Sequence, residues 1–143
     1  LASIIGVIGA MFGVWYGAKL SRSAAQNLLG QQAKAEFALA FADTLFKLNL
    51  TTSAAGNAEA LQILREDYKK HLLAYIRLRS IVSRKEQLKI DTAWRNYVLD
   101  DKNDLPEEQE IYRFKHILTL KSNEHQHLLA AKHINTLLTC IAA

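Results

Sequence analysis

The segment NEHQHLLAAKH, residues 123–133, holds the residue types and spacing that come closest to a metal site. Glu124 and His127 form a Glu-x-x-His pair, which a helix would place on one face. Carboxylate-bridged metal centres in helical bundles use this spacing, but they need a second such pair and two further carboxylates. The chain offers only Asp67 with His71, spaced four residues apart instead of three. We therefore predict a mutually satisfied polar pair, with Glu124 and His127 as the candidate metal ligands and no cofactor.

No other pattern in the sequence predicts catalysis. The remaining histidines of this region, at 116, 125 and 133, lack the spacing of a zinc site. Neither G-x-x-x-x-G-K-[ST] nor G-x-G-x-x-G occurs, so no phosphate-binding loop is predicted. Cys140 is the single cysteine, has no base predicted beside it and cannot form an internal disulfide. The sequence therefore predicts a protein that is not an enzyme.

The first eighteen residues, LASIIGVIGAMFGVWYGA, carry no charged side chain. As a helix they would reach about 27 Å at about 1.5 Å per residue, close to the ~30 Å hydrocarbon core of a bilayer. Trp15 and Tyr16 near the end, followed by Lys19 and Arg22, have the order of an aromatic belt and a positive flank. We predict a single-pass anchor over residues 1–18 in the lipid of a bacterial inner membrane, with the C-terminal domain in the cytoplasm.

Glycines within this segment predict close helix packing. Gly9, Gly13 and Gly17 recur every fourth residue, and Gly6 widens the strip that they form on a helix. A homo-oligomer or a larger membrane complex is the expected partner. Two other interpretations remain open: an apolar helix buried at the centre of a soluble homo-oligomer, and a cleaved signal peptide, although no basic n-region is visible.

The rest of the chain has the composition of long helices in one compact domain. Pro106 is the only proline, and four of the six glycines lie in the predicted anchor. Apolar residues recur at helical spacing and predict helices over 19–50, 58–82, 84–99 and 105–142. We predict an all-α fold, in which an N-terminal transmembrane helix continues into an antiparallel cytoplasmic bundle of about four helices.

Local signals support these boundaries. TTSAAGN at 51–57 is typical of a loop, and Ser83 with Glu86 forms a capping-box pattern. Asp104, Pro106 and Glu107 predict the start of the last helix. Along that helix Ile117, Leu120, Glu124, His127, Ala131, Ile134, Leu138 and Ile141 form the predicted seam, with a kink plausible at 121–123.

Charge is distributed unevenly along the chain, whose formal net charge is +4. Residues 65–95 have nine Lys/Arg and four Asp/Glu, whereas residues 100–110 have one Lys and six Asp/Glu. These blocks predict mutual or intersubunit complementarity, or contact of the basic block with anionic headgroups. Nucleic-acid binding is not expected, because the surface is too neutralised.

These observations predict a non-catalytic membrane protein that acts as a scaffold or accessory subunit. Self-association of its helices, or docking onto a larger membrane assembly, would be its mode of action. The alternative is a small pore-forming or membrane-permeabilising effector, although the anchor offers no charge to line a selective pore.

Overall fold

The computed structural model describes residues 2–50, 56–99, 107, 113–118 and 126–142; for 2–17, 20, 56–58 and 118 it describes the backbone alone. These residues contain five helices and no strand, which confirms the all-α prediction. The helices are α1 (Ala2–Leu50), α2 (Gly56–Ile81), α3 (Arg84–Leu99), α4 (Lys115–Leu118) and α5 (Gln126–Ala142). Across this described part, none of the helices combines the length and apolar composition needed to cross a membrane.

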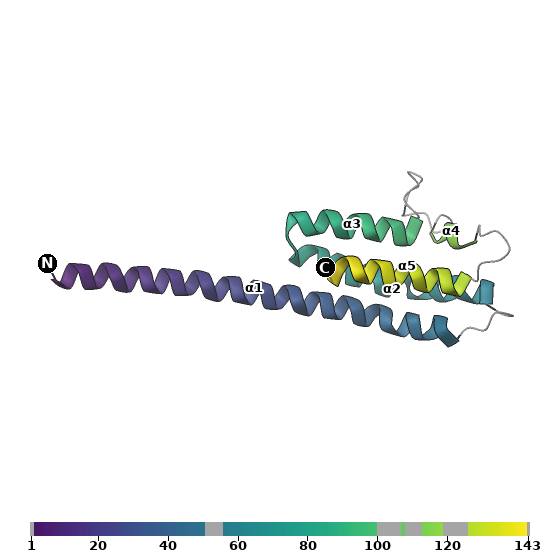
Figure 1. The fold of residues 1–143 in the computed structure, drawn as a ribbon, viewed down its shortest axis with the longest axis horizontal. Helices are drawn as coiled ribbons and strands as arrows, with labels where there is room; N and C mark the ends of the chain where they lie inside the picture. Colours follow the sequence, from purple (N-terminus) through teal and green to yellow (C-terminus); the bar gives the residue numbers. More distant parts are fainter. Residues whose placement is uncertain (1, 51–55, 100–106, 108–112, 119–125, 143) are drawn as a thin grey trace.

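One long helix, α1, dominates the shape of the molecule. Its C-terminal half packs against α2 and α5, while its N-terminal half projects beyond the bundle (Figure 1). Helices α1, α2, α3 and α5 alternate in direction, so the bundle is antiparallel (Figure 1). The turn between α2 and α3 therefore lies at the end of the bundle from which α1 projects.

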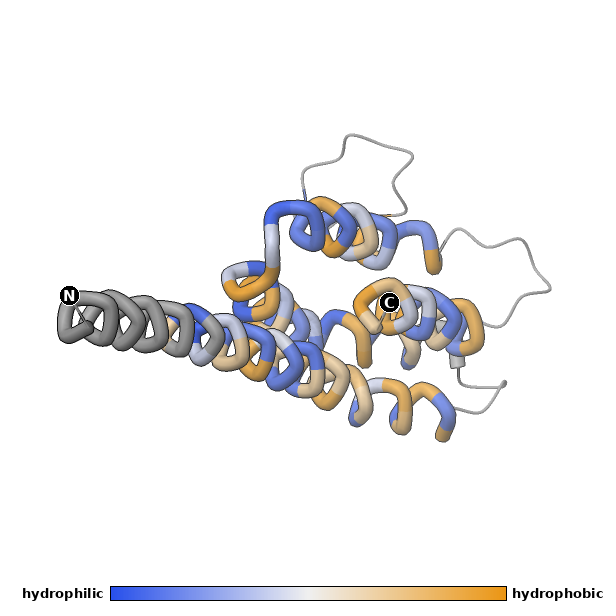
Figure 2. Tube along the Cα trace, turned by 60° about the vertical axis from the view of Figure 1, so that its left-hand side comes forward, coloured by the Kyte–Doolittle hydropathy of each residue, from blue (hydrophilic) through white to orange (hydrophobic). Residues whose placement is uncertain are grey.

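The core follows the apolar spacing of the sequence. On α1, Phe37, Phe41 and Leu48 are almost completely buried at spacings of four and seven residues. Hydrophobic and hydrophilic positions alternate along the bundle helices, as expected when only one side of each is buried (Figure 2). The other large buried side chains are Leu64, Leu78, Trp94, Tyr97, Phe114, Ile117, Ile134 and Leu137.

The capping box predicted between α2 and α3 is confirmed. The backbone N–H and the hydroxyl of Ser83 both donate to Glu86 Oε2, at 3.2 and 3.0 Å, and the Glu86 N–H lies 3.4 Å from Ser83 Oγ. These bonds satisfy donors that the first turn of α3 leaves without intrahelical partners. The chain therefore reverses at Val82 and Ser83 with no extended loop.

The prediction of one helix over residues 105–142 is wrong at residues 113 and 114. Phe114 has a φ of 59°, which an α-helix does not tolerate. Its N–H donates to Val98 O at 2.8 Å, and its buried ring contacts Tyr68 and Tyr97. Tertiary packing of this ring therefore overrides the helical pattern at Phe114, and α4 begins only after it, at Lys115.

The predicted helix start at Asp104 to Glu107 also needs correction. Glu107 lies in a turn, where its carboxylate accepts hydrogen bonds from side chains of α2 and α3 instead of serving the first turn of a helix. Asp104 and Pro106 lie outside the described residues.

The buried face of α5 is displaced from the predicted seam. Ala130 and Leu137 are buried, whereas Ala131 and Leu138 are half-buried. Because α5 packs against α1, α2 and α3, its buried face is wider than a two-helix seam. Ile134 and Ile141 belong to both the predicted and the observed face.

Candidate functional site

The two candidate metal ligands, Glu124 and His127, do not form a described site. Glu124 lies outside the described residues, and His127 is half-buried on α5. Within the ranges that the structure describes, no group of three or more His, Cys, Asp or Glu side chains is arranged to hold a metal ion. The helical spacing of Glu124 and His127 therefore gains no third ligand from the described part of the fold.

The fold instead assembles a buried polar network around His71 of α2. Asp67 lies one turn before it on the same helix, Thr44 belongs to α1, and Tyr97 belongs to α3. Thr44 Oγ1 lies 2.5 Å from Asp67 Oδ2 and 2.8 Å from His71 Nε2. His71 Nδ1 lies 3.0 Å from the Tyr97 hydroxyl. Four side chains from three helices are thus connected in one chain of hydrogen bonds.

The donors and acceptors of this network fix the tautomer of His71. Thr44 has one hydroxyl proton, which it donates to the Asp67 carboxylate. The Thr44 oxygen must then accept from His71 Nε2–H, which is also 3.1 Å from Ala40 O. His71 Nδ1 is consequently the acceptor for the Tyr97 hydroxyl. The neutral, Nε2-protonated imidazole satisfies every link.

Burial reinforces the neutral state of His71. The side chain is fully buried, and its ring stacks on Phe41 with centroids 3.8 Å apart. Desolvation lowers the pKa of His71 to about 4, in spite of the nearby Asp67 carboxylate. Burial also raises the pKa of Tyr97 well above its ordinary value. Both groups therefore remain uncharged at neutral pH.

Asp67 is the charged end of the network and the point where it reaches the surface. Burial acts to raise the pKa of Asp67, but hydrogen bonds from Thr44 and Lys47 outweigh it and hold the pKa below its ordinary value. Lys47 Nζ lies 3.3 Å from Asp67 Oδ1, and Lys70 Nζ lies 3.6 Å from the same oxygen. The buried carboxylate is thus paired, as buried charges require.

The chemistry open to this network is limited by its burial. Thr44 and His71 have no exposed surface, and Tyr97 is 1% exposed. A general base must lie within hydrogen-bond reach of the proton that it removes from a substrate. Because the imidazole is enclosed by α1, α2 and α3, the network joins helices and does not present a reactive atom.

A second polar cluster is centred on Glu107. Its Oε1 accepts from Trp94 Nε1 at 2.7 Å and from the Tyr68 hydroxyl at 2.9 Å. Arg113 donates from Nε to the Glu107 carbonyl at 2.8 Å and places its guanidinium 4.0 Å above the Tyr68 ring. The cluster attaches the chain after α3 to α2 and α3.

Asp91 holds the outer side of the α2–α3 pair. It accepts from Arg79 Nε at 2.8 Å and from the Tyr75 hydroxyl at 2.7 Å, while the Tyr75 ring stacks on Trp94 at 4.6 Å. The Arg79 hydrogen bond holds the pKa of Asp91 below its ordinary value. Like the His71 network, these contacts position helices.

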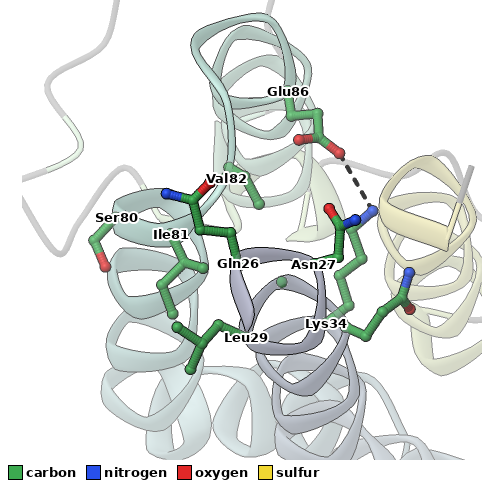
Figure 3. Close-up of a pocket in the computed structure, with 10 residues that line it drawn as sticks. Gln26, Asn27, Leu29, Lys34, Ser80, Ile81, Val82 and Glu86 are labelled. Carbon is green, nitrogen blue, oxygen red and sulfur yellow. Dashed lines mark hydrogen bonds and ion pairs between the residues drawn. The ribbon is translucent and has the colours of Figure 1, made fainter. Parts of the chain in front are cut away.

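The surface clefts between described helices include two that border α3. The first has a volume of about 700 Å³ and is formed where α1 reaches the α2–α3 turn. It is lined mainly by amide and aliphatic side chains, and the 3.3 Å ion pair of Lys34 and Glu86 lies along one side (Figure 3). The second, of about 360 Å³, lies between α3 and α5 and includes Cys140. Cys140 Sγ is 4.0 Å from Lys89 O. Among the hydrogen bonds described for these two clefts, none joins a nucleophile to a base.

The predicted membrane-interface and packing residues lie mostly beyond the described side chains. Trp15 and Tyr16, and the glycines at 6, 9, 13 and 17, are described only as backbone positions of α1. Lys19 and Arg22 are exposed on the projecting half of α1.

Comparison of this chain with protein-family models, with curated proteins and with solved structures found no match.

Sequence reasoning missed the His71 network because two of its members are not close in sequence. Asp67 and His71 form a visible i, i+4 pair in the sequence, but Thr44 and Tyr97 come from other helices. One signal was present: Thr44 is a polar residue inside the apolar stripe that contains Phe37, Phe41 and Leu48. A polar residue at a core-facing position requires a buried partner.

Proposed function

We propose that this protein is a non-catalytic membrane-anchored scaffold or accessory subunit, whose helical bundle is carried at the inner membrane surface by α1. The observation that carries the proposal is the continuity of α1, which runs as one helix from Ala2 to Leu50. The same helix contains residues 2–18 of the apolar segment at one end and the core residues Phe37 and Phe41 toward the other. The bundle would therefore be coupled to the anchor without a flexible linker.

The length of the projecting helix sets the distance between the bundle and the bilayer. The cleft at the α2–α3 turn involves α1 from Gln26 onward, eight residues beyond Ala18. Eight helical residues span about 12 Å. The headgroup region beyond the hydrocarbon core is about 5–8 Å thick on each side. The α2–α3 turn would thus lie within about 4–7 Å of the headgroups if α1 stands upright.

The basic residues around the α2–α3 turn support an orientation in which this turn faces the bilayer. Residues 77–89, which include the turn, have five Lys/Arg and one acidic residue, Glu86. The cytoplasmic leaflet attracts basic residues near its surface, with about 1 kcal/mol for each Lys or Arg. This attraction acts over a Debye length of about 8 Å. The basic end of the bundle would therefore favour contact with anionic lipid.

The burial of the polar clusters supports a non-catalytic role. In the described residues, the strongest constellation of titratable and hydroxyl groups, around His71, lies inside the core. Its side chains connect α1, α2 and α3 and so make the bundle a rigid body on the end of α1. A rigid, anchored bundle is suited to presenting helix faces to other proteins.

Sequential extraction of membranes with high salt, carbonate and detergent tests the anchor. We expect only detergent to release the full-length protein. Ile8→Arg places a charge near the middle of the predicted span, at a cost of about 2.5–3.5 kcal/mol, and should move part of the protein into the carbonate extract. Leu73→Arg, at an exposed position of α2, is the matched control and should behave like the parent. Release of the parent by salt alone would contradict the proposal.

A further inference from the structure

The side of α1 that points away from the bundle has no charge along its whole length. Helix α1 contains six charged residues. At 3.6 residues per turn, all six fall on the buried side of the helix or on its flanks, which leaves an arc of about 180° without charge. The charged residues are Lys19, Arg22, Lys34, Glu36, Asp43 and Lys47. A solvent-facing helix surface normally carries charged residues, so this distribution needs an explanation.

The charged residues of the bundle-bound half are occupied by the bundle itself. Four ion pairs connect α1 to α2 and α3 and border its buried face. They are Lys34–Glu86 at 3.3 Å, Glu36–Arg77 at 3.0 Å, Asp43–Lys70 at 3.2 Å and Lys47–Asp67 at 3.3 Å. The charges of α1 thus serve the intramolecular interface, and the opposite side is left neutral.

We call this neutral side the outward face of α1. Its exposed residues are Ser21, Ala24, Asn27, Leu28, Gln31, Gln32, Ala35, Ala38, Leu39, Ala42, Phe46, Asn49 and Leu50. Leu28, Leu39 and Phe46 are 69%, 71% and 63% exposed. With Ala35 and Ala42 they are spaced by seven, four, three and four residues, the 3–4 alternation of a helix-pairing seam.

The composition of the outward face favours a second copy of the chain as its partner. In a parallel pair related by a two-fold axis, each residue meets its own copy. Small and apolar residues then face their equals, and no like charges are opposed. Asn27 and Gln31 carry amides that both donate and accept, so they can bond their own copies. A partner with a charged binding surface could form no ion pair with the outward face, because this face has no charged residue.

The predicted packing glycines lie on the same side of the helix. Helical geometry places Gly6, Gly13 and Gly17 within the arc that contains Leu28 and Leu39. A pair formed along the outward face would therefore continue without rotation into the predicted anchor, where small residues allow close approach.

The size of the outward face is adequate for a stable pair. Residues 18–50 span about 50 Å as a helix, and a helix is about 10 Å wide, which gives on the order of 500 Å² on each copy. Including the glycine-containing segment extends the contact to about 70 Å and on the order of 700 Å². A standard interface buries about 800 Å² for each partner. Residues 18–50 alone would give a small interface, and the whole helix a standard one.

We infer that two copies of this chain pair in parallel along the outward face of α1, with Leu28, Leu39 and Phe46 at the seam. This inference deepens the proposed function and depends on it for the parallel direction, because two anchors in one membrane enter it from the same side. The partner of the scaffold would then be the protein itself, and the two bundles would stand on opposite sides of a central helix pair.

Cysteine crosslinking of the full-length chain in native membranes tests the pairing. In a Cys140→Ser background, Leu39→Cys should give a disulfide-linked dimer on mild oxidation, because a parallel pair brings residue 39 next to its own copy. Leu73→Cys is the matched control, since Leu73 is also exposed, at 60%, but lies on α2. We expect at least tenfold more dimer from Leu39→Cys than from Leu73→Cys.

The direction of the pair is tested by mixing two variants. Leu28→Cys and Phe46→Cys should each crosslink with themselves and not with each other. Crosslinking only between the two different variants would overturn the parallel pair. Absence of a Leu39→Cys dimer in protein that only detergent extracts would overturn the pairing and leave the anchor intact. A dimer in protein that remains in the soluble fraction would support pairing and contradict the proposed function.

Discussion

Thr44 and His71 meet between α1 and α2 with 2.8 Å between Thr44 Oγ1 and His71 Nε2, and neither side chain has any exposed surface. The contact joins the helix that carries the predicted anchor to the centre of the bundle. Thr44 also bonds to Asp67, and His71 also bonds to Tyr97, so that the four side chains form one hydrogen-bonded network. Because the order of donors and acceptors in this network is fixed, removing a member or protonating His71 should lower the free energy of unfolding.

Replacing Thr44 with valine should destabilise the bundle. Thr44→Val keeps the shape of the side chain but removes the hydroxyl between Asp67 and His71. The loss of a buried hydrogen-bonding group costs about 1–3 kcal/mol. Urea unfolding followed by tryptophan fluorescence measures this change. Thr136→Val, which removes an exposed hydroxyl bonded to Lys132 O of its own helix, is the control and should change stability by less than about 0.5 kcal/mol. Equal effects would refute a special role for Thr44.

Stability should fall as the pH is lowered from about 6.5 to 4. The pKa of His71 is about 4 in the folded protein and 6.5 by default, so the unfolded chain binds the proton more readily. The contribution of neutral His71 is present above pH 6.5 and is lost as the pH falls toward 4, by a total of about 3 kcal/mol. Between pH 7.5 and pH 5 the unfolding free energy should fall by about 2 kcal/mol, because pH 5 is still above the folded pKa of His71.

The assignment of this pH dependence to His71 has two checks. His71→Gln should lower stability at pH 7.5 but flatten the dependence between pH 7.5 and pH 5. NMR titration of the imidazole in the folded parent should show no midpoint above pH 6. A midpoint near 6.5 for His71 would be inconsistent with its buried, neutral state.

Glu107 should contribute to stability although it lies in a turn. Glu107→Ala leaves Trp94 Nε1–H and the Tyr68 hydroxyl without their shared acceptor, for which we expect a loss of about 2 kcal/mol in thermal or urea unfolding. Glu66→Ala removes an exposed carboxylate bonded to Gln62 one turn away and should cost less than about 0.5 kcal/mol. Similar losses in the two variants would show that the carboxylate does not hold these side chains.

The α2–α3 turn should sense anionic lipid. In a Cys140→Ser background, an environment-sensitive probe attached through Ile81→Cys should shift to the blue in nanodiscs with anionic lipid, and high salt should reverse the shift. The same probe at Glu59→Cys, near the start of α2 and the opposite end of the bundle, should not respond. A response at Glu59→Cys that equals that at Ile81→Cys would contradict the proposed orientation.

The all-helical fold could be predicted because its signals are local. Apolar spacing predicted a helix over 19–50, on which Phe37, Phe41 and Leu48 are buried, and the Ser83–Glu86 pair predicted the start of α3. The break in the predicted helix at Phe114 could not be predicted, because the φ of 59° is stabilised by a backbone hydrogen bond to Val98 and by contacts with rings of α2 and α3. Such contacts between distant residues leave no periodic signal.

The polar network was hidden from the sequence for the same reason. The i, i+4 spacing of Asp67 and His71 was visible, but their acceptors and donors on α1 and α3 appear only after the helices pack. The outward face of α1 was also missed, because its neutrality becomes meaningful only when the opposite side is known to face the bundle.

The central claim, that α1 anchors the bundle in lipid, is tested most directly by nitroxide accessibility at Ile8. In the full-length chain in a bilayer, a label at Ile8→Cys in the Cys140→Ser background should collide readily with oxygen and poorly with a water-soluble relaxation agent. A label at Ser23→Cys, an exposed position of α1 off the outward face, should be accessible to the water-soluble agent. High accessibility of the Ile8 label to the water-soluble agent, or shielding from both agents, would contradict the account. Shielding from both would instead place the segment inside a protein oligomer.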